Sequence, residues 1–347
     1  MTHEDIRISL PSKGRLAQDA EAFLAACGLT IDKPNPRQYA ASFHELPSVT
    51  VLFQRPTDIV VSVREGSVDF GITGLDVTAE YGGNADAILV LHEALGFGGC
   101  RLSVAVPETW RDVHTVGDLA LYARGMPHPL RVATKFKHLT RAFFEEHLEE
   151  HLNAPSYTLV EAEGTLEIAP AIGYADCIVD LVSSGQTLRD NRMRPLRDGV
   201  ILRSQAALIA NRARLTARPD VLDAARLLLE YTEAHLRAQE HVLVTANMRG
   251  ESPEAIAERM FAQAVLGGLQ GPTIAQVIAP GGTADGWYAV QIVVRRADLS
   301  AAIAELRAIG GSGVVVTPVT YIFEEEPERL SAMLAAVQSA DETDESR

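Results

Sequence analysis

The segment "DLVSSGQTLRDN", residues 180–191, combines the residue types that bind a phosphate group. It follows "CIVDLV" at 177–182, a run typical of a buried strand, and it leads into residues typical of a helix start. Backbone N–H groups in a tight glycine turn converge on an anion, and a helix N-terminus adds partial positive charge. The residues that we expect to hold the phosphate are Ser183, Ser184, Gly185, Gln186 and Thr187.

Two residues of this segment have separate expected roles. Gly185 lets the backbone approach an anion closely, because it carries no Cβ. The carboxylate of Asp180 suits sugar hydroxyls or the ligand shell of a magnesium ion better than the phosphate itself. The alternative interpretation is a polar turn that only joins a strand to a helix. Neither the GxxxxGK[ST] loop nor a GxGxxG after a strand is present in the sequence, so the pattern alone leaves both interpretations open.

Cations follow two other strand-like runs. Lys13 and Arg15 come directly after "IRISLP" at 6–11, where a helix begins. A cation at a helix N-terminus is unfavourable unless an anion lies nearby, so we expect both to contact phosphates. The alternative for them is a solvated helix start. Arg55 precedes Pro56 in a turn and is a further candidate, with a surface ion pair as its alternative.

A third candidate group lies in "GITGLD", residues 71–76. The sequence predicts a strand that ends in a glycine loop, a further candidate for ligand binding. Its candidate residues are Thr73, Gly74 and Asp76. The alternative is a capped helix with Asp76 in its first turn, where an acidic side chain is favourable.

Composition excludes some classes of function. The 347 residues carry a net charge of −15, which argues against binding to nucleic acid but not to a small anionic substrate in a cleft. The N-terminal residues lack the apolar stretch of an export signal, and no apolar run is long enough to span a membrane. Three widely spaced cysteines without a CxxC pair fit a reducing compartment. We therefore expect a cytoplasmic protein.

The elements that would position these residues alternate between strands and helices up to residue 193, which predicts an α/β fold with a parallel sheet. Residues 218–240 read as one long amphipathic helix. Beyond it the predicted order over residues 241–323 is βαββαβ, the ferredoxin-like arrangement. The acidic tail, residues 326–347, is expected to fray.

The stretch 160–193 resembles the phosphoribosyl-diphosphate signature of the ATP phosphoribosyltransferase family. Ser184 stands where the family usually has threonine, which exchanges one hydroxyl for another. Further segments resemble the same family in the same order, so that the resemblance spans residues 6–323. These segments are "LPSKGRL" (10–16), "RPTDIVVSVREGSVDFGITGLD" (55–76), "GFGGCRLSVAVP" (96–107) and "GLQGPTIAQV" (268–277).

The resemblance implies a two-lobed α/β catalytic region, like a periplasmic binding protein, and a C-terminal ACT-like domain that binds histidine. Such a long-form enzyme needs no separate regulatory subunit. The expected divisions are lobe I at 1–106 with 194–240 returning to it, lobe II at 107–193, the ACT-like domain at 241–325 and the tail at 326–347. The effector would dock at the "GLQGPT" and "VVVTPV" segments, which are expected to be loops.

The reaction that the resemblance implies is the first step of histidine biosynthesis, with inhibition by histidine. N1 of ATP attacks the anomeric carbon of phosphoribosyl diphosphate, and pyrophosphate leaves. Lys13, Arg15 and Asp180 are the expected catalytic residues, and Glu163 joins Asp180 as a candidate for ribose hydroxyls or metal. Mg²⁺ is the expected cofactor, and its ligands stay open. The family also implies a homo-oligomer, typically a hexamer built from dimers.

Three alternatives remain at this point. A two-lobed pattern also fits a solute-binding protein, which the missing export signal and the phosphate turn disfavour. A histidine-sensing regulatory protein without catalysis would need only the last domain, and Lys13, Arg15 and the intact turn argue against it. The third alternative is a phosphoribosyltransferase for another base.

Overall fold

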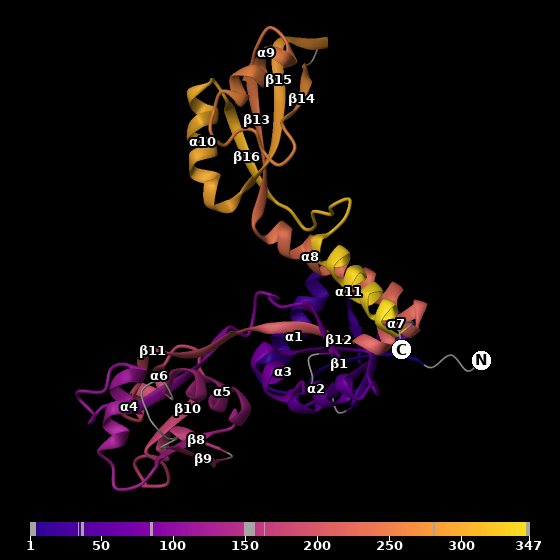
Figure 1. Ribbon diagram of the computed structural model, residues 1–347. Coiled ribbons are helices and arrows are strands. Elements are labelled where there is room, and N and C mark those ends of the chain that lie inside the picture. Colours follow the sequence, from indigo (N-terminus) through magenta and orange to yellow (C-terminus); the bar gives the residue numbers. More distant parts are fainter. Residues whose placement is uncertain are drawn as a thin grey trace. The chain divides into compact units, whose positions relative to one another are not determined.

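The computed structural model describes residues 5–33, 35, 38–83, 86–148, 157–162, 164–279 and 282–344. The chain divides into two compact units, Met1–Arg226 with Ser331–Arg347, and Leu227–Leu330. Two β-sheets belong to the first unit and one to the second (Figure 1). The second unit begins within a long helix, whereas the sequence predicted a division at residue 241.

Within the described residues, seven strands form the first sheet, in the order β2-β3-β4-β1-β5-β12-β6. They are β1 (Ile6–Pro11), β2 (Ile31–Asp32), β3 (Ala40–Phe43), β4 (Val49–Gln54), β5 (Phe70–Gly74), β6 (Ile88–His92) and β12 (Ala206–Asn211). Strand β1 pairs in parallel with β4 and β5, whereas β12 runs antiparallel to β5 and β6. With α1 (Arg15–Ala26), α2 (Pro56–Arg64) and α3 (Leu75–Tyr81), this sheet makes the first lobe.

The second lobe is built on a five-stranded sheet, in the order β11-β7-β10-β8-β9 in the part of the chain described. Its strands are β7 (Cys100–Pro107), β8 (Leu130–Thr134), β9 (Tyr157–Glu161), β10 (Cys177–Val182) and β11 (Met193–Ser204). Strands β8, β9 and β10 are parallel, and β7 runs antiparallel to β10 and β11. Its helices are α4 (Val116–Arg124), α5 (Lys137–Leu148), α6 (Gln186–Asp190) and the 3-10 turn η1 (Leu166–Ile168).

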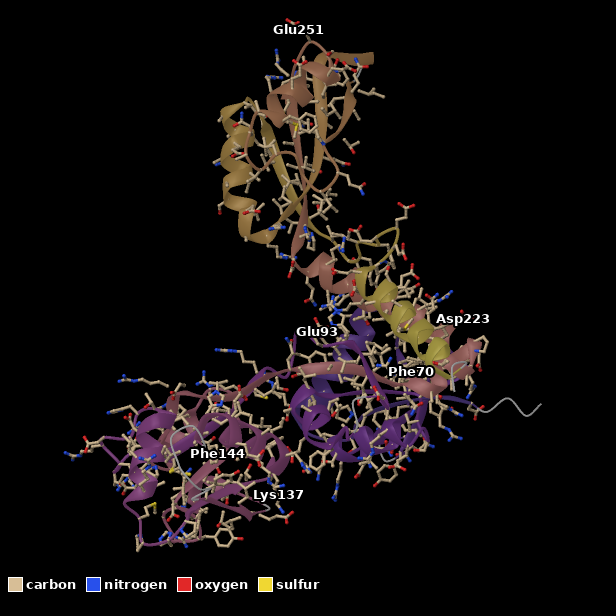
Figure 2. The ribbon with its side chains drawn as sticks, in the orientation of Figure 1. Phe70, Glu93, Lys137, Phe144, Asp223 and Glu251 are labelled. Atoms are coloured by element: carbon tan, nitrogen blue, oxygen red, sulfur yellow. The ribbon has the colours of Figure 1, made fainter. Side chains whose placement is uncertain are left out.

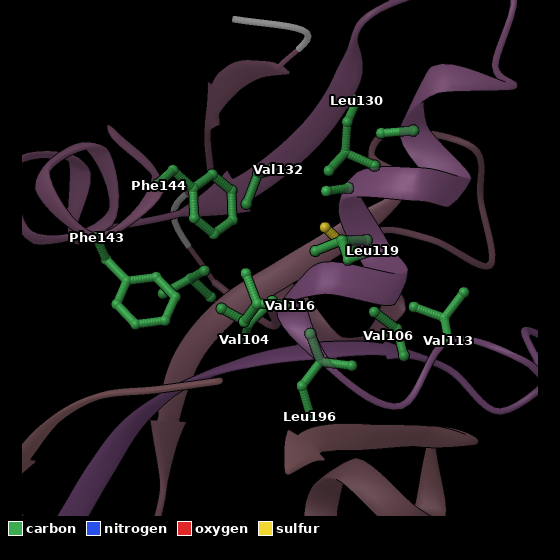
Figure 3. Packing of buried hydrophobic residues seen from close by; sticks show 14 of the residues in the cluster. Val104, Val106, Val113, Val116, Leu119, Leu130, Val132, Phe143, Phe144 and Leu196 are labelled. Atoms are coloured by element: carbon green, nitrogen blue, oxygen red, sulfur yellow. The ribbon is translucent and has the colours of Figure 1, made fainter. Parts of the chain in front are cut away.

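The two faces of the second sheet are covered by different helices. On one face, Leu119 of α4 and Phe144 of α5 pack with Val104 and Val132, and all four side chains are buried (Figure 3). Burying each such side chain contributes about 1.5–3 kcal/mol. On the other face, Leu188 of α6 packs with side chains from β7, β10 and η1. The turn that begins α6 is thereby anchored to the sheet.

The predicted α/β class is confirmed, but both sheets of the first unit are mixed and not parallel. Strand β7 lies in the second sheet, whereas the sequence placed residues 1–106 in the first lobe. The chain crosses between the sheets at 93–99 and at Gln205, and Gly96 N–H donates to Gln205 Oε1 at 3.0 Å. The predicted boundaries at 106 and 194 therefore fall inside β7 and β11, because long-range strand pairing decides which sheet a strand joins.

Three helices follow the sheets of the first unit. They are α7 (Arg212–Ala217), α8 (Pro219–Gln239) and α11 (Glu328–Asp344). Helix α8 confirms the predicted long helix. The tail was expected to fray, but α11 forms from it, with Met333 and Val337 buried. Arg212 Nη1 also donates to the carbonyl of Ala336 at 3.0 Å. Apolar contacts and this hydrogen bond order a segment that reads as acidic.

The second unit confirms the predicted βαββαβ order. Its elements are β13 (His241–Arg249), α9 (Pro253–Phe261), β14 (Thr273–Ala279), β15 (Gly282–Arg295), η2 (Arg296–Asp298), α10 (Leu299–Ala308) and β16 (Ser312–Pro318). The antiparallel sheet has the order β14-β15-β13-β16, and α9 and α10 pack on one face of it. The "VVVTPV" segment, named as an effector loop, lies mostly within β16, in agreement with the last strand predicted at 313–323.

Candidate functional site

The turn at 183–187 follows β10 directly, as predicted. Gly185 adopts a left-handed conformation with φ 72° and ψ 8°, which glycine accommodates without the strain of a Cβ. Ser183, Ser184, Gln186 and Thr187 are exposed around it. The Gln186 N–H donates to Ser184 Oγ at 3.3 Å. Exposed hydroxyls and main chain therefore surround a glycine turn at the carboxyl end of a strand.

Helix α6 is too short to supply the positive charge expected at a helix N-terminus. It has five residues, so its dipole adds little positive charge at the turn. Positive charge comes instead from Arg189, which sequence reasoning missed. Its Nη2 donates to the carbonyl of Ser184 at 3.3 Å and to Gln186 Oε1 at 2.9 Å. The sequence did offer an indication of this role: Arg189 comes four residues after Gly185, which is about one helical turn.

Asp180 lies in β10 and is half-buried. Burial raises the pKa of its carboxyl above the ordinary value, and Glu167 raises it further, against a hydrogen bond from the Leu181 N–H and the charge of Lys135. Lys135 directly follows β8 and is exposed, and sequence reasoning missed it. Its signal was a lysine directly after a buried strand. Asp180 and Lys135 thus share the edge of the sheet that carries the turn.

The same edge carries an ion pair between β9 and the start of α5. Lys137 Nζ lies 2.5 Å from Glu161 Oε2, and Figure 2 labels this lysine. Tyr174 donates its hydroxyl to the carbonyl of Glu161 at 2.8 Å. Glu163, the other predicted ligand for ribose or metal, lies outside the described residues.

Lys13, Arg15 and Arg55 gather at one edge of the first sheet. The Ser12 N–H donates to the carbonyl of Gln54 at 2.8 Å, which ties the loop after β1 to the end of β4. Arg15 is the first residue of α1 and is 92% exposed, with its Nε 3.5 Å from Asp19 Oδ2. Lys13 and Arg55 are exposed as well. Three cations at one sheet edge suit phosphate groups.

Thr73, Gly74 and Asp76 occupy the end of β5 and the first turn of α3, without an intervening loop. Thr73 is fully buried and donates to the carbonyl of Pro56 at 3.3 Å. Asp76 is also buried and accepts from Ser204 Oγ at 2.5 Å. A Cβ on Gly74 would lie 2.3 Å from Asp76 Oδ1. Asp76 lies in the first turn of α3, as in the alternative interpretation, but no side chain caps this helix, and Asp76 instead binds Ser204 near the crossover.

The structure therefore gathers the predicted residues into two groups on two sheets. The first lobe carries Lys13, Arg15 and Arg55, and the second carries Asp180 and the turn 183–187. The described residues include no group of three or more His, Cys, Asp or Glu side chains that could hold a metal ion. A metal at the second group would thus depend on one or two carboxylates together with ligand oxygens.

Family models and curated relatives that match this chain all point to one family. The ATP phosphoribosyltransferase family model matches residues 55–230, and the model described as HisG, C-terminal domain, matches residues 238–321. ATP phosphoribosyltransferase 2, chloroplastic, of Arabidopsis thaliana is 44% identical over 337 residues, which cover 96% of this chain and 80% of that protein. ATP phosphoribosyltransferase of Rhodopseudomonas palustris (strain HaA2) is 34% identical over 333 residues, covering 94% and 97% respectively.

A solved structure shares the fold. The ATP phosphoribosyl transferase (HisG:HisZ) complex from Thermotoga maritima contains a chain that matches with a TM-score of 0.50 and 23% identity. The match covers 66% of this chain and 98% of that one. The match therefore shows a shared fold over about two thirds of this chain.

Proposed function

The chain belongs to the ATP phosphoribosyltransferase family, and we propose that it transfers the phosphoribosyl group of phosphoribosyl diphosphate to N1 of ATP. This reaction is the first step of histidine biosynthesis. The observation that carries the proposal is the turn 183–187, with its left-handed Gly185 and exposed hydroxyls at the end of β10. Such a turn suits the 5-phosphate of the sugar.

The two groups of residues divide the work of the reaction. The turn holds the 5-phosphate, Asp180 accepts from ribose hydroxyls, and Lys13, Arg15 and Arg55 contact the phosphates of ATP. The lone pair of adenine N1 forms a bond to C1 of the ribose. The bond from C1 to the diphosphate oxygen breaks, and its electron pair leaves with the diphosphate. Positioning and charge neutralisation are then the main tasks of the protein.

Mg²⁺ is the cofactor that we propose, bound as a complex with the diphosphate. It would neutralise charge on the leaving group. Asp180 is a described carboxylate at the site, and a magnesium site in a phosphate-transfer enzyme commonly has one or two carboxylates plus substrate oxygens. The donor set therefore fits a metal that arrives with its substrate.

The test measures the ultraviolet absorbance of N1-substituted adenine after ATP, phosphoribosyl diphosphate and Mg²⁺ are mixed. Gly185→Ala should lower turnover by about 100-fold, the cost of misplacing a donor in such a site. Gly173→Ala is the matched control, because Gly173 has φ 73° in the same lobe and a Cβ there meets no atom within 4 Å. Full turnover by Gly185→Ala would remove the assignment of the turn.

Regulation by histidine is the second part of the proposal. The C-terminal family match and the βαββαβ unit support histidine binding there, with Gly268 and Gly271 at positive φ in the segment before β14. We propose a homo-oligomer, typically a hexamer, that is inhibited without a separate regulatory subunit. Sedimentation of the pure chain, with and without histidine, tests the assembly.

The proposed location is the cytoplasm or an equally reducing compartment. Cys27, Cys100 and Cys177 form no disulfide in the described part of the chain. Among the described residues, no helix has the length and apolar character needed to cross a bilayer. The two Arabidopsis relatives carry the word chloroplastic in their names, so fractionation of the source cells is the direct test.

A further inference from the structure

Two arginines lie directly opposite each other beside the phosphate turn. Arg203 of β11 pairs with Arg101 of β7, and Arg101 pairs in turn with Val182 of β10. Opposite residues of antiparallel strands point to the same face, with Cβ atoms about 4.5–5.5 Å apart. The row Arg203, Arg101 and Val182 therefore ends at the residue that precedes Ser183.

The arginine pair and the turn share one face of the second sheet. Val182 and Ala105 belong to the cluster that packs with Leu188 of α6. Leu102, the neighbour of Arg101, belongs to the opposite cluster, under α4 and α5. Because side chains alternate along a strand, Arg101 lies on the face of α6. Arg203, its direct partner, lies there too.

The two guanidinium groups lie directly opposite each other and are not ion-paired within the described residues. Neither guanidinium has an ion pair or a hydrogen bond there, although the chain has 46 acidic and 31 basic side chains. By contrast, the guanidinium of Arg131 binds both carboxylate oxygens of Asp176. Like charges directly opposite in a sheet are destabilising. An anion bound between the two side chains would relieve this repulsion.

A second observation on the same face of the sheet is a buried hydroxyl without a hydrogen-bond partner. Ser103 lies two residues from Arg101 and pairs with Asp180 of β10. Its side chain is fully buried, and its Oγ has no hydrogen-bond partner in the described part of the chain. Most buried polar groups in folded proteins have a partner. The charged groups on this face include Lys135, Asp180 and Glu167 as well as the arginines.

The spacing of the two arginines from the turn fits a diphosphate. Strands lie about 4.8 Å apart, so Arg101 and Arg203 lie about 5 Å and 10 Å from the strand that leads into the turn. One ribose separates the 5-phosphate of the donor from its diphosphate. Guanidinium groups bind phosphoryl oxygens in a bidentate manner, and two of them match two phosphoryl groups. We propose that Arg101 and Arg203 bind the diphosphate of phosphoribosyl diphosphate, which rests on the function proposed above.

The test is calorimetric titration of the full-length chain with pyrophosphate and Mg²⁺, and separately with ribose 5-phosphate and with ATP. In the Arg101→Gln/Arg203→Thr double variant, the Kd for pyrophosphate should rise at least about tenfold, as expected for lost charge-assisted hydrogen bonds. The values for ribose 5-phosphate and ATP should stay unchanged. Arg111→Gln is the matched control, because Arg111 is an exposed arginine of the same lobe.

Stability provides an independent readout. Removing one of two opposed cations should raise Tm by about 1–3 °C in Arg203→Thr, while the same substitution weakens pyrophosphate binding. Unchanged pyrophosphate affinity, a loss of ATP affinity instead, or an equal loss for all ligands would overturn the proposal. If the wild-type chain bound pyrophosphate through the pair but did not modify ATP, the proposed function would fail and the anion site would stand.

Discussion

Two carboxyl groups in the second lobe, those of Asp180 and Asp176, have pKa values that are shifted in opposite directions. Burial raises the pKa of Asp180, as does Glu167. At Asp176, burial also opposes ionisation, but hydrogen bonds from the Arg131 side chain and backbone outweigh it and lower the pKa. The first carboxyl therefore binds a proton more tightly in the folded than in the unfolded chain, and the second less tightly.

Asp180→Asn should stabilise the protein at neutral pH. Because the folded pKa is raised, the penalty of the wild-type carboxylate develops as pH rises from the unfolded value through the folded one. Thermal unfolding should show a higher Tm for the variant at neutral pH and no gain at a pH below both values. The same variant should lose about tenfold in kcat/KM for phosphoribosyl diphosphate, the value of one hydrogen bond to a charged group.

Asp176→Asn is the control, because the expected change in Tm at neutral pH is opposite to that of Asp180→Asn. Its wild-type carboxylate stabilises the fold above the unfolded pKa, and this stabilisation disappears as pH falls through the lowered folded pKa. The variant should therefore lose Tm at neutral pH. Two variants with the same pH profile would contradict the assignment of the shifts.

At the scale of elements, a carboxylate of the first lobe caps a helix of the second. Glu80 of α3 is buried and accepts from the backbone N–H groups of His138 and Leu139 in α5, at 2.8 and 3.0 Å. Tyr81 adds a bond from its hydroxyl to the carbonyl of Lys135 at 3.3 Å. A carboxylate at a helix N-terminus is favourable, and here it also links the lobes.

Glu80→Ala should cost about 1 kcal/mol of unfolding free energy, as for a lost helix cap. It should also lower kcat, because the two groups of proposed substrate-binding residues lie on different lobes, and this contact holds the lobes together. Asp118→Ala is the matched control, since Asp118 accepts from the N–H groups of His114 and Thr115 within one lobe, both at 2.9 Å. Equal kcat values for the two variants would leave Glu80 with a structural role only.

At the scale of the whole molecule, the chain passes between its two units twice. Helix α8 leads into the second unit, and α11 returns the chain to the first. Near these passages, Ile322 N–H donates to the carbonyl of Ala234 at 3.0 Å, and Arg329 pairs with Glu233 at 3.0 Å. Truncating the chain at residue 241 would therefore also remove α11 from the first unit.

Replacing residues 241–321 with a short Gly/Ser linker is the better test of histidine regulation. Because α8 and the segment before α11 lie side by side, a short linker suffices, and α11 is kept. We expect transfer to ATP to continue and inhibition by histidine to disappear, as measured by initial rates. Inhibition that survived this deletion would place the effector site elsewhere.

The sequence by itself determined the local elements and much of the candidate site. Apolar periodicity predicted the long helix and the βαββαβ unit, and the serine and glycine residues after "CIVDLV" predicted the turn at 183–187. These features depend on neighbours along the chain, such as the left-handed Gly185 that a tight turn accommodates.

Only the tertiary structure decided the partners of those elements. It placed β7 in the second sheet, paired Asp76 with Ser204 across 128 residues, and set Arg101 opposite Arg203. It also ordered the acidic tail as α11 through two buried side chains. Such pairings depend on long-range register and packing, which local periodicity does not specify, because a strand pattern is the same whichever neighbour it joins.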